Sequence, residues 1–137
     1  MANYQNIVNA CRAAVPAGNR FIHGRLIDFS QGYSGGYPLI TLLPFTVTDA
    51  RSTPDDTFDS ASLVIGFWQQ DRPDTSPAQR EATIAEMDIL SDTFLNTLLD
   101  RNDLKLSNIL KEPQYQMFQA TLSGFAVSLT IQLVSPC

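Results

Sequence analysis

The fold is decided by residues 76–100, which read SPAQREATIAEMDILSDTFLNTLLD. Ser76 offers a side-chain oxygen as helix N-cap, Pro77 suits the first helical position, and Gln79 stands at the reciprocal position of a capping box. Apolar residues then recur at spacings of three and four: Ile84, Met87, Leu90, Phe94, Leu95 and Leu98, with Ser91 among them. This pattern predicts a helix of about six turns from Pro77 to about Asp100. Its apolar stripe needs a partner, and a sheet is the available one.

The clearest strand lies near the C-terminus, where apolar residues alternate with small or polar ones from Phe125 to Leu133. Such alternation is typical of a strand with one buried face. Ser123-Gly124 is typical of a tight turn, so we expect the preceding strand to end at Leu122. Residues 104–109 predict a short extended piece that leads into that strand.

Three further strands are predicted before the long helix. Residues 21–29 and 39–47 alternate so that each strand has two usable faces. The loop 30–38 between them is rich in Gly and Tyr, which suits a flexible hairpin. Pro44 favours an edge position or a bulge. Residues 61–68 are nearly continuous in apolar side chains, which indicates a central strand covered on both faces.

A short amphipathic helix opens the chain. Residues 4–15 place apolar side chains at helical spacing, and residues 16–19 then stop the helix. The full pattern predicts an α+β fold in the order α-β-β-β-α-β-β. We expect a mainly antiparallel sheet of about five strands with two helices packed on one face. No repeat or composition shift divides the chain, so we expect a single domain over residues 1–137.

Composition and charge argue against several classes of protein. The net charge is −5 and the nine basic residues are scattered, which does not fit a protein that holds nucleic acid by neutralising phosphates. Two cysteines, Cys11 and Cys137, are too few for a disulfide scaffold. The first residues lack the regions of a secretory signal, and no run approaches the ~20 apolar residues that span a bilayer. We therefore expect a protein made in a cytoplasm-like compartment and not held in a membrane.

No residues in the sequence form a recognisable catalytic, metal or cofactor site. His23 is the single histidine and has no evident nucleophile or second ligand beside it, so we interpret it as structural. The aspartates of residues 49–59 lack the spacing of an EF-hand calcium loop. The glycines of residues 32–36 match no phosphate-binding fingerprint. The carboxylates of residues 81–88 are typical of a solvated helix face, and we expect no enzyme.

Element order and particular residues together resemble the tail-completion or tail-terminator proteins of bacteriophages, which act at the head–tail joint. The resemblance is one of pattern across nearly the whole chain. The matching features are the short helix up to Val15, the strand–loop–strand pair around residues 32–37, the apolar strand to Trp68, the long helix with Ile84, Met87, Leu90, Phe94 and Leu98, and the closing strand 124–131.

The resemblance implies a non-enzymatic virion protein, made in the host cytoplasm, that closes into a homo-oligomeric ring such as a hexamer or dodecamer. Such a ring joins connector and tail proteins and lets DNA pass through an acidic lumen, without specific nucleic-acid binding. The acidic balance of this chain fits that role. By their position in two long loops, we expect these residues to make contacts, with the aromatic ones as anchors: Tyr33, Gly35, Gly36, Tyr37, Asp55, Asp56 and Phe58.

Two other functions stay open at this point. A small ligand-binding or regulatory module can share the pattern, and it would have a closed apolar pocket and act as a monomer or dimer. An enzyme with an unfamiliar carboxylate site would need Asp28, or the aspartates of residues 49–59, to meet His23 in one cleft.

Overall fold

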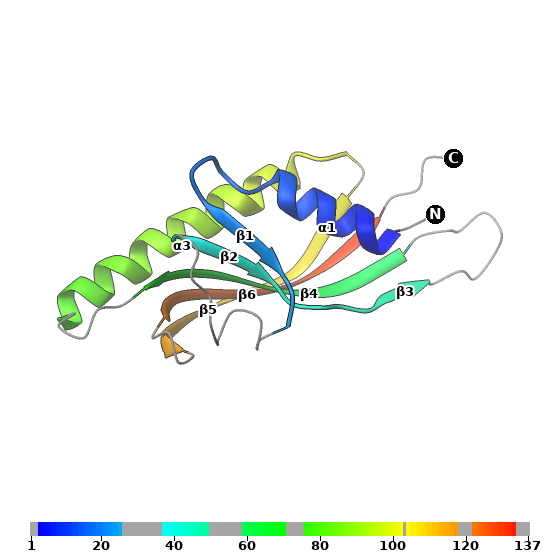
Figure 1. Cartoon of the computed structure of the whole chain (residues 1–137). Coiled ribbons are helices and arrows are strands. Elements are labelled where there is room, and N and C mark those ends of the chain that lie inside the picture. Colours follow the sequence, from blue (N-terminus) through cyan, green and yellow to red (C-terminus); the bar gives the residue numbers. More distant parts are fainter. Residues whose placement is uncertain are drawn as a thin grey trace.

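The computed structural model describes residues 3–25, 37–49, 59–70, 76–102, 104–117 and 122–133. Its elements are α1 (Asn3–Ala13), β1 (Arg20–His23), β2 (Leu39–Leu42), β3 (Val47–Asp49), β4 (Asp59–Gln70), α3 (Pro77–Leu99), β5 (Leu104–Met117) and β6 (Leu122–Leu133). Both helices lie on the same side of one sheet (Figure 1). The expected α+β class is therefore confirmed.

Helix α3 begins as its sequence predicts. Ser76 Oγ accepts a hydrogen bond from the Gln79 amide at 3.2 Å, and the Gln79 side chain accepts one from the Ser76 amide at 2.8 Å. These two bonds satisfy amide groups that have no partner inside the helix. The buried side chains are Ile84, Met87, Ser91, Phe94, Leu95 and Leu98, which confirms the predicted stripe. Neither helix in the described residues is long and apolar enough to cross a lipid bilayer.

The sheet is built around β4. Its strand order is β1-β2-β4-β6-β5, and the short β3 also pairs with β4. β4 and β6 pair antiparallel from Ser60 opposite Gln132 to Gln70 opposite Leu122. β5 pairs antiparallel with the other side of β6. The sheet is therefore mainly antiparallel, and β4 is its central strand.

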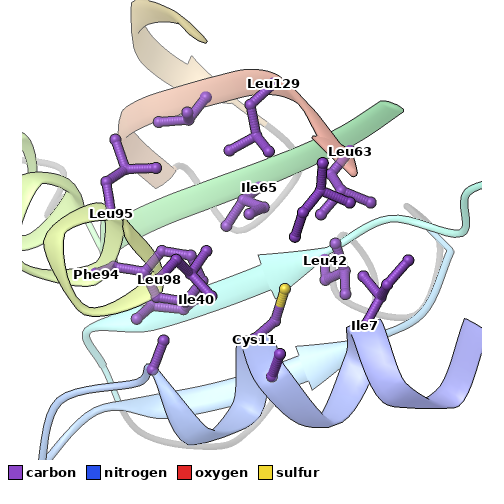
Figure 2. Close-up of a cluster of buried hydrophobic side chains, with 14 of the residues drawn as sticks. Ile7, Cys11, Ile40, Leu42, Leu63, Ile65, Phe94, Leu95, Leu98 and Leu129 are labelled. Atoms are coloured by element: carbon purple, nitrogen blue, oxygen red, sulfur yellow. The ribbon is translucent and has the colours of Figure 1, made fainter. Parts of the chain in front are cut away.

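The core lies between the two helices and one face of the sheet. Alternate residues of β4 and β6 point into it, as a period of two requires: Ala61, Leu63, Ile65 and Phe67 from β4, and Val127, Leu129 and Ile131 from β6. Figure 2 shows Ile7 and Cys11 of α1 facing Ile40 and Leu42 of β2 in the same cluster. One continuous core therefore unites both helices with the sheet.

The connection between β1 and β2 is not the hairpin that the sequence predicted. β1 runs parallel to β2, with Arg20 opposite Leu39 and His23 opposite Leu42. A hairpin joins antiparallel strands, whereas parallel neighbours need a crossover of a dozen or more residues. The segment 24–38 is long enough for such a crossover. Its Gly and Tyr content indicated a break between strands but held no information on their relative direction.

The predicted strand 39–47 is interrupted. β2 ends at Leu42 and β3 begins at Val47, and the gap contains Pro44, which has no amide hydrogen to donate to a neighbouring strand. The Leu43 amide still donates to the Val64 carbonyl at 3.2 Å. The irregularity expected at Pro44 therefore becomes a complete break between two strands.

Strand β5 is longer than predicted. Its pairing with β6 is irregular between Ser107 and Leu110, where Asn108 has a φ of 54°. Asparagine tolerates this left-handed conformation better than most residues. The irregularity explains why an unbroken alternation was not visible in the sequence of this strand.

Ser123 and Gly124 lie inside β6 and not in the predicted turn. Gly124 pairs with Trp68 of β4. A Cβ at Gly124 would overlap the carbonyl oxygen of Phe67. The glycine therefore permits a close approach of two strand backbones, which is the other common use of glycine in a strand.

Candidate interaction surface

Most of the residues predicted to make contacts lie outside the described residues: Tyr33, Gly35, Gly36, Asp55, Asp56 and Phe58. Tyr37 is described, and it is half-buried just before β2. The next residue, Pro38, accepts a hydrogen bond from the Arg20 amide at 3.0 Å. Tyr37 therefore lies at the end of the sheet where β1 begins.

Both ring nitrogens of His23 have hydrogen-bond partners. Nδ1 lies 2.9 Å from the Leu42 carbonyl oxygen. Because a carbonyl only accepts, Nδ1 carries the proton. Nε2 lies 2.7 Å from the Tyr4 hydroxyl and accepts from it in the neutral ring. Tyr4 also stacks on Phe45 with ring centroids 4.2 Å apart, so His23 ties α1 to β1 and to the segment after β2.

The carboxylates considered as catalytic partners of His23 are only partly described. Asp28, Asp55 and Asp56 lie outside the described residues, and the strand register sets Asp49 opposite Asp59. In the described parts of the chain, no group of three or more His, Cys, Asp or Glu residues could hold a metal ion.

Cys11 lies in the core and is fully buried. Burial raises the pKa of its thiol to about 12, against the lowering effect of the nearby Arg101 charge. The thiol therefore stays protonated at neutral pH and packs as a small apolar side chain.

The sheet face opposite the helices carries exposed apolar side chains. Ser128 of β6 pairs with Val64 on one side and with Leu110 on the other, and paired residues project from the same face of a sheet. Val64 is 40% exposed and Leu110 is 54% exposed. We call this surface the open face, and it comprises Ser62, Val64, Leu110, Ser128 and Thr130.

Strand β4 is covered on both faces only toward its C-terminal end, so the prediction of full coverage was wrong. Trp68 is buried, and its Nε1 donates to Thr41 Oγ1 at 3.0 Å. Its indole ring occupies the space that a side chain at Gly66 would need. Ser62 and Val64, nearer the start of the strand, are exposed. The serine at position 62 between two buried apolar residues was the signal in the sequence for this exposed half.

In the described part of the chain, the strand path of the sheet ends at β1 and at β5, and the short β3 borders β4 off this path. The Arg20 amide donates to Pro38, just before β2, and the Gly24 amide donates to Leu42 of β2. The backbone groups of Phe21 and His23 therefore point the other way, as alternation along a strand requires. Among the described strands, β5 pairs with β6 alone. The β1 and β5 edges of the described sheet could therefore each accept a further strand.

Lys111 joins β5 to helix α3. Its ammonium group contacts the carboxylates of Asp88 and Asp92, the latter at 2.7 Å, and it lies 5.4 Å from the centre of the Phe125 ring. Burial lowers the pKa of Lys111, but the hydrogen bonds and charges of the two aspartates outweigh burial and raise that pKa overall. This contact fixes which flank of α3 lies over β5.

No protein-family model matches the sequence, and no curated protein matches it either.

Proposed function

We propose that this protein is a structural subunit of the head–tail joint of a tailed bacteriophage. It closes into a ring, a hexamer or a dodecamer, that joins the connector to the tail and lets DNA pass. It acts by association with itself and with its neighbours, without catalysis or a cofactor. The open face supports this proposal most, because the exposed apolar side chains of Val64 and Leu110 lie on the side of the sheet opposite the helices. The element order, which resembles that of tail-completion proteins, suggests the biological setting.

The open face has the composition of a contact surface. A solvated sheet face is normally polar, and Ser62, Ser128 and Thr130 follow that rule. Val64 and Leu110 do not. Complete burial of a Val or Leu side chain contributes about 1.5–3 kcal/mol relative to full exposure. Val64 and Leu110 are 40% and 54% exposed, so a partner that covers them gains roughly half of this for each residue. Val64 and Leu110 flank the same residue, Ser128, and exposed apolar groups that lie close together mark interaction sites.

The first test is native mass spectrometry of the purified chain over a wide concentration series, with and without candidate connector and tail-tube proteins. A closed ring, alone or on the connector, is the expected result. A chain that stays monomeric in every condition and is not retained by connector or tail-tube proteins in a pull-down would overturn the proposal.

A paired substitution tests the open face itself. Val64→Ser with Leu110→Ser removes the exposed apolar groups, and we expect assembly or connector binding to weaken by more than about tenfold. The matched control is Ile89→Ser, which removes a 67%-exposed apolar side chain from helix α3 and should leave assembly unchanged. Equal effects from both variants would show that the open face has no special role.

One hollow bears on the alternative of a small ligand-binding module, although it is neither closed nor mainly apolar as that alternative requires. A partly open hollow of about 370 Å³ is lined by Pro44, Phe45, Thr46, Ser60, Ala61 and Ser62. It lies where the segment between β2 and β3 leaves β4, and its volume is at the lower end of the range for small-molecule sites. A thermal-shift screen in which small molecules stabilise a chain that remains monomeric or dimeric would favour this alternative over the ring.

A further inference from the structure

The β1 end of the sheet is basic. Residues 3–25, which contain α1 and β1, include three arginines and neither aspartate nor glutamate. Arg12 of α1 lies over the Phe21 ring of β1 at 5.5 Å, and Arg20 is the first residue of β1. Both arginine side chains are exposed, and in the described parts of the chain neither forms an ion pair.

The opposite end of the sheet, formed by β5 and one flank of α3, is acidic. Asp88 and Asp92 lie over β5 because both contact Lys111. Glu81 precedes Asp88 by about two helical turns and so lies on the same flank of α3. The flank therefore carries three carboxylates, and the ammonium group of Lys111 neutralises only one of them. The two other charged residues of β5 are a lysine and a glutamate, whose charges cancel. The side chains of Asp88 and Asp92 are 45% and 61% exposed, so their charge is available to a partner.

We propose that the partner of each edge is a second copy of this chain, with the β1 edge of one copy docked on the β5 edge of the next. This inference rests on the self-association proposed above, and it assigns the edges that join neighbouring copies in addition to the open face. Arg12 and Arg20 then face the carboxylates of the α3 flank, and opposite charges across an interface select and orient the partner. The outward backbone groups of Phe21 and His23 add β1 to the neighbouring sheet as a further strand.

The charge distribution also determines the kind of symmetry. A contact between two different edges leaves one edge of each kind free at the two ends of a growing assembly. Copies can therefore continue to add, and the assembly closes into a ring when the rotation between neighbours closes. A two-fold contact of the β1 edge with itself would set Arg12 and Arg20 against their own copies. The same contact at the β5 edge would set carboxylates against carboxylates, and like charges disfavour both arrangements.

Two assembly-defective variants test the docking. The basic-edge variant carries Arg12→Glu with Arg20→Glu, and the acidic-edge variant carries Glu81→Lys with Asp92→Asn. All four side chains are exposed, so both variants should fold, and a thermal melt checks this. Native mass spectrometry at low ionic strength, where surface charges are least screened, should show each variant as a monomer. An equimolar mixture should recover oligomers, because each variant keeps one unaltered edge and the two reversed edges attract each other.

The matched control is Glu86→Lys, which changes charge on the polar side of α3 that faces away from β5 and should assemble like the wild type. Variants that assemble as well as the wild type, or a mixture that stays monomeric, would overturn the edge assignment. If the wild-type ring forms in that case, the proposed function survives and only the docking surfaces are wrong. A wild-type chain that is monomeric with and without connector proteins would overturn both.

Discussion

The rings of Phe67 in β4 and Phe94 in α3 meet edge to face, with centroids 5.4 Å apart and planes inclined by 72°. Both side chains are completely buried. This is a favoured geometry for aromatic pairs and adds to the energy of burial alone. The contact joins the central strand of the sheet directly to the long helix.

Replacing Phe94 should destabilise the protein strongly. We expect Phe94→Ala to lower the free energy of unfolding by about 3–5 kcal/mol, because the substitution leaves a cavity under α3. Urea denaturation followed by circular dichroism measures this, and Phe94→Leu should lose less because it fills more of the space. A loss below about 1 kcal/mol for the alanine variant would mean that the helix can collapse onto the sheet.

Gly66 should not tolerate a side chain. A Cβ at this position would lie 2.5 Å from Cε2 of Trp68 and 2.7 Å from Thr41 Oγ1, so Gly66→Ala has to displace the indole ring. We expect a loss of about 1–3 kcal/mol and a red shift in tryptophan emission, which reports on Trp68 because it is the single tryptophan. Ser62→Ala, on the same strand and face, is the control and should leave the emission unchanged. An unshifted spectrum in Gly66→Ala would show that the ring does not lie over the glycine.

Cys11 should resist alkylation in the folded protein. Its thiol is buried and its pKa is raised to about 12, so almost none of the reactive thiolate is present at pH 8. Peptide mapping after iodoacetamide treatment should find Cys11 unmodified in native protein and modified in urea. Rapid labelling without denaturant would reveal local opening of α1.

Lys111 should stabilise the fold in a way that depends on pH and salt. Since the folded state raises the pKa of Lys111, its contribution is fully present below the unfolded value of about 10.4 and is lost as pH rises through the raised value. Lys111→Met, which keeps the apolar stem, should therefore lower Tm at neutral pH, and the difference from wild type should shrink at strongly alkaline pH and in high salt. Lys105→Met, an exposed change in the same strand, is the control. A Tm difference that changes with neither pH nor salt would show that Lys111 stabilises the fold through packing alone.

Local signals in the sequence predicted the positions of the helices and strands better than the way in which the strands pair. The Ser76–Gln79 capping box and the spacing up to Leu98 define α3 within a few residues, because both act inside one helix. The direction of β1 relative to β2 was predicted wrongly, because it depends on the path of a long crossover and not on the residues of either strand. Gly124 was misassigned for a similar reason, since the neighbour that requires a glycine, Phe67, lies far away in sequence.

The interaction surfaces were only partly visible in the sequence. Most of the contact residues predicted from the two long loops lie outside the described residues, and that prediction remains untested. The open face was missed because Val64 and Leu110 come to flank Ser128 only through the register of β4, β6 and β5. The clustering of Arg12 and Arg20 at one edge likewise depends on which strand is outermost, and this is a property of the whole sheet.

The parallel pairing of β1 with β2 also determines the relative direction of the two edge strands, β1 and β5. β2 and β6 run opposite to β4, and β5 runs opposite to β6, so β5 has the direction of β4. Because β1 runs in the same direction as β2, the two outermost strands, β1 and β5, point in opposite directions. A sheet that continues from β5 of one copy to β1 of an equally oriented neighbour is thus antiparallel at every junction, which is the more stable pairing per residue. A hairpin between β1 and β2 would have made each of those junctions parallel.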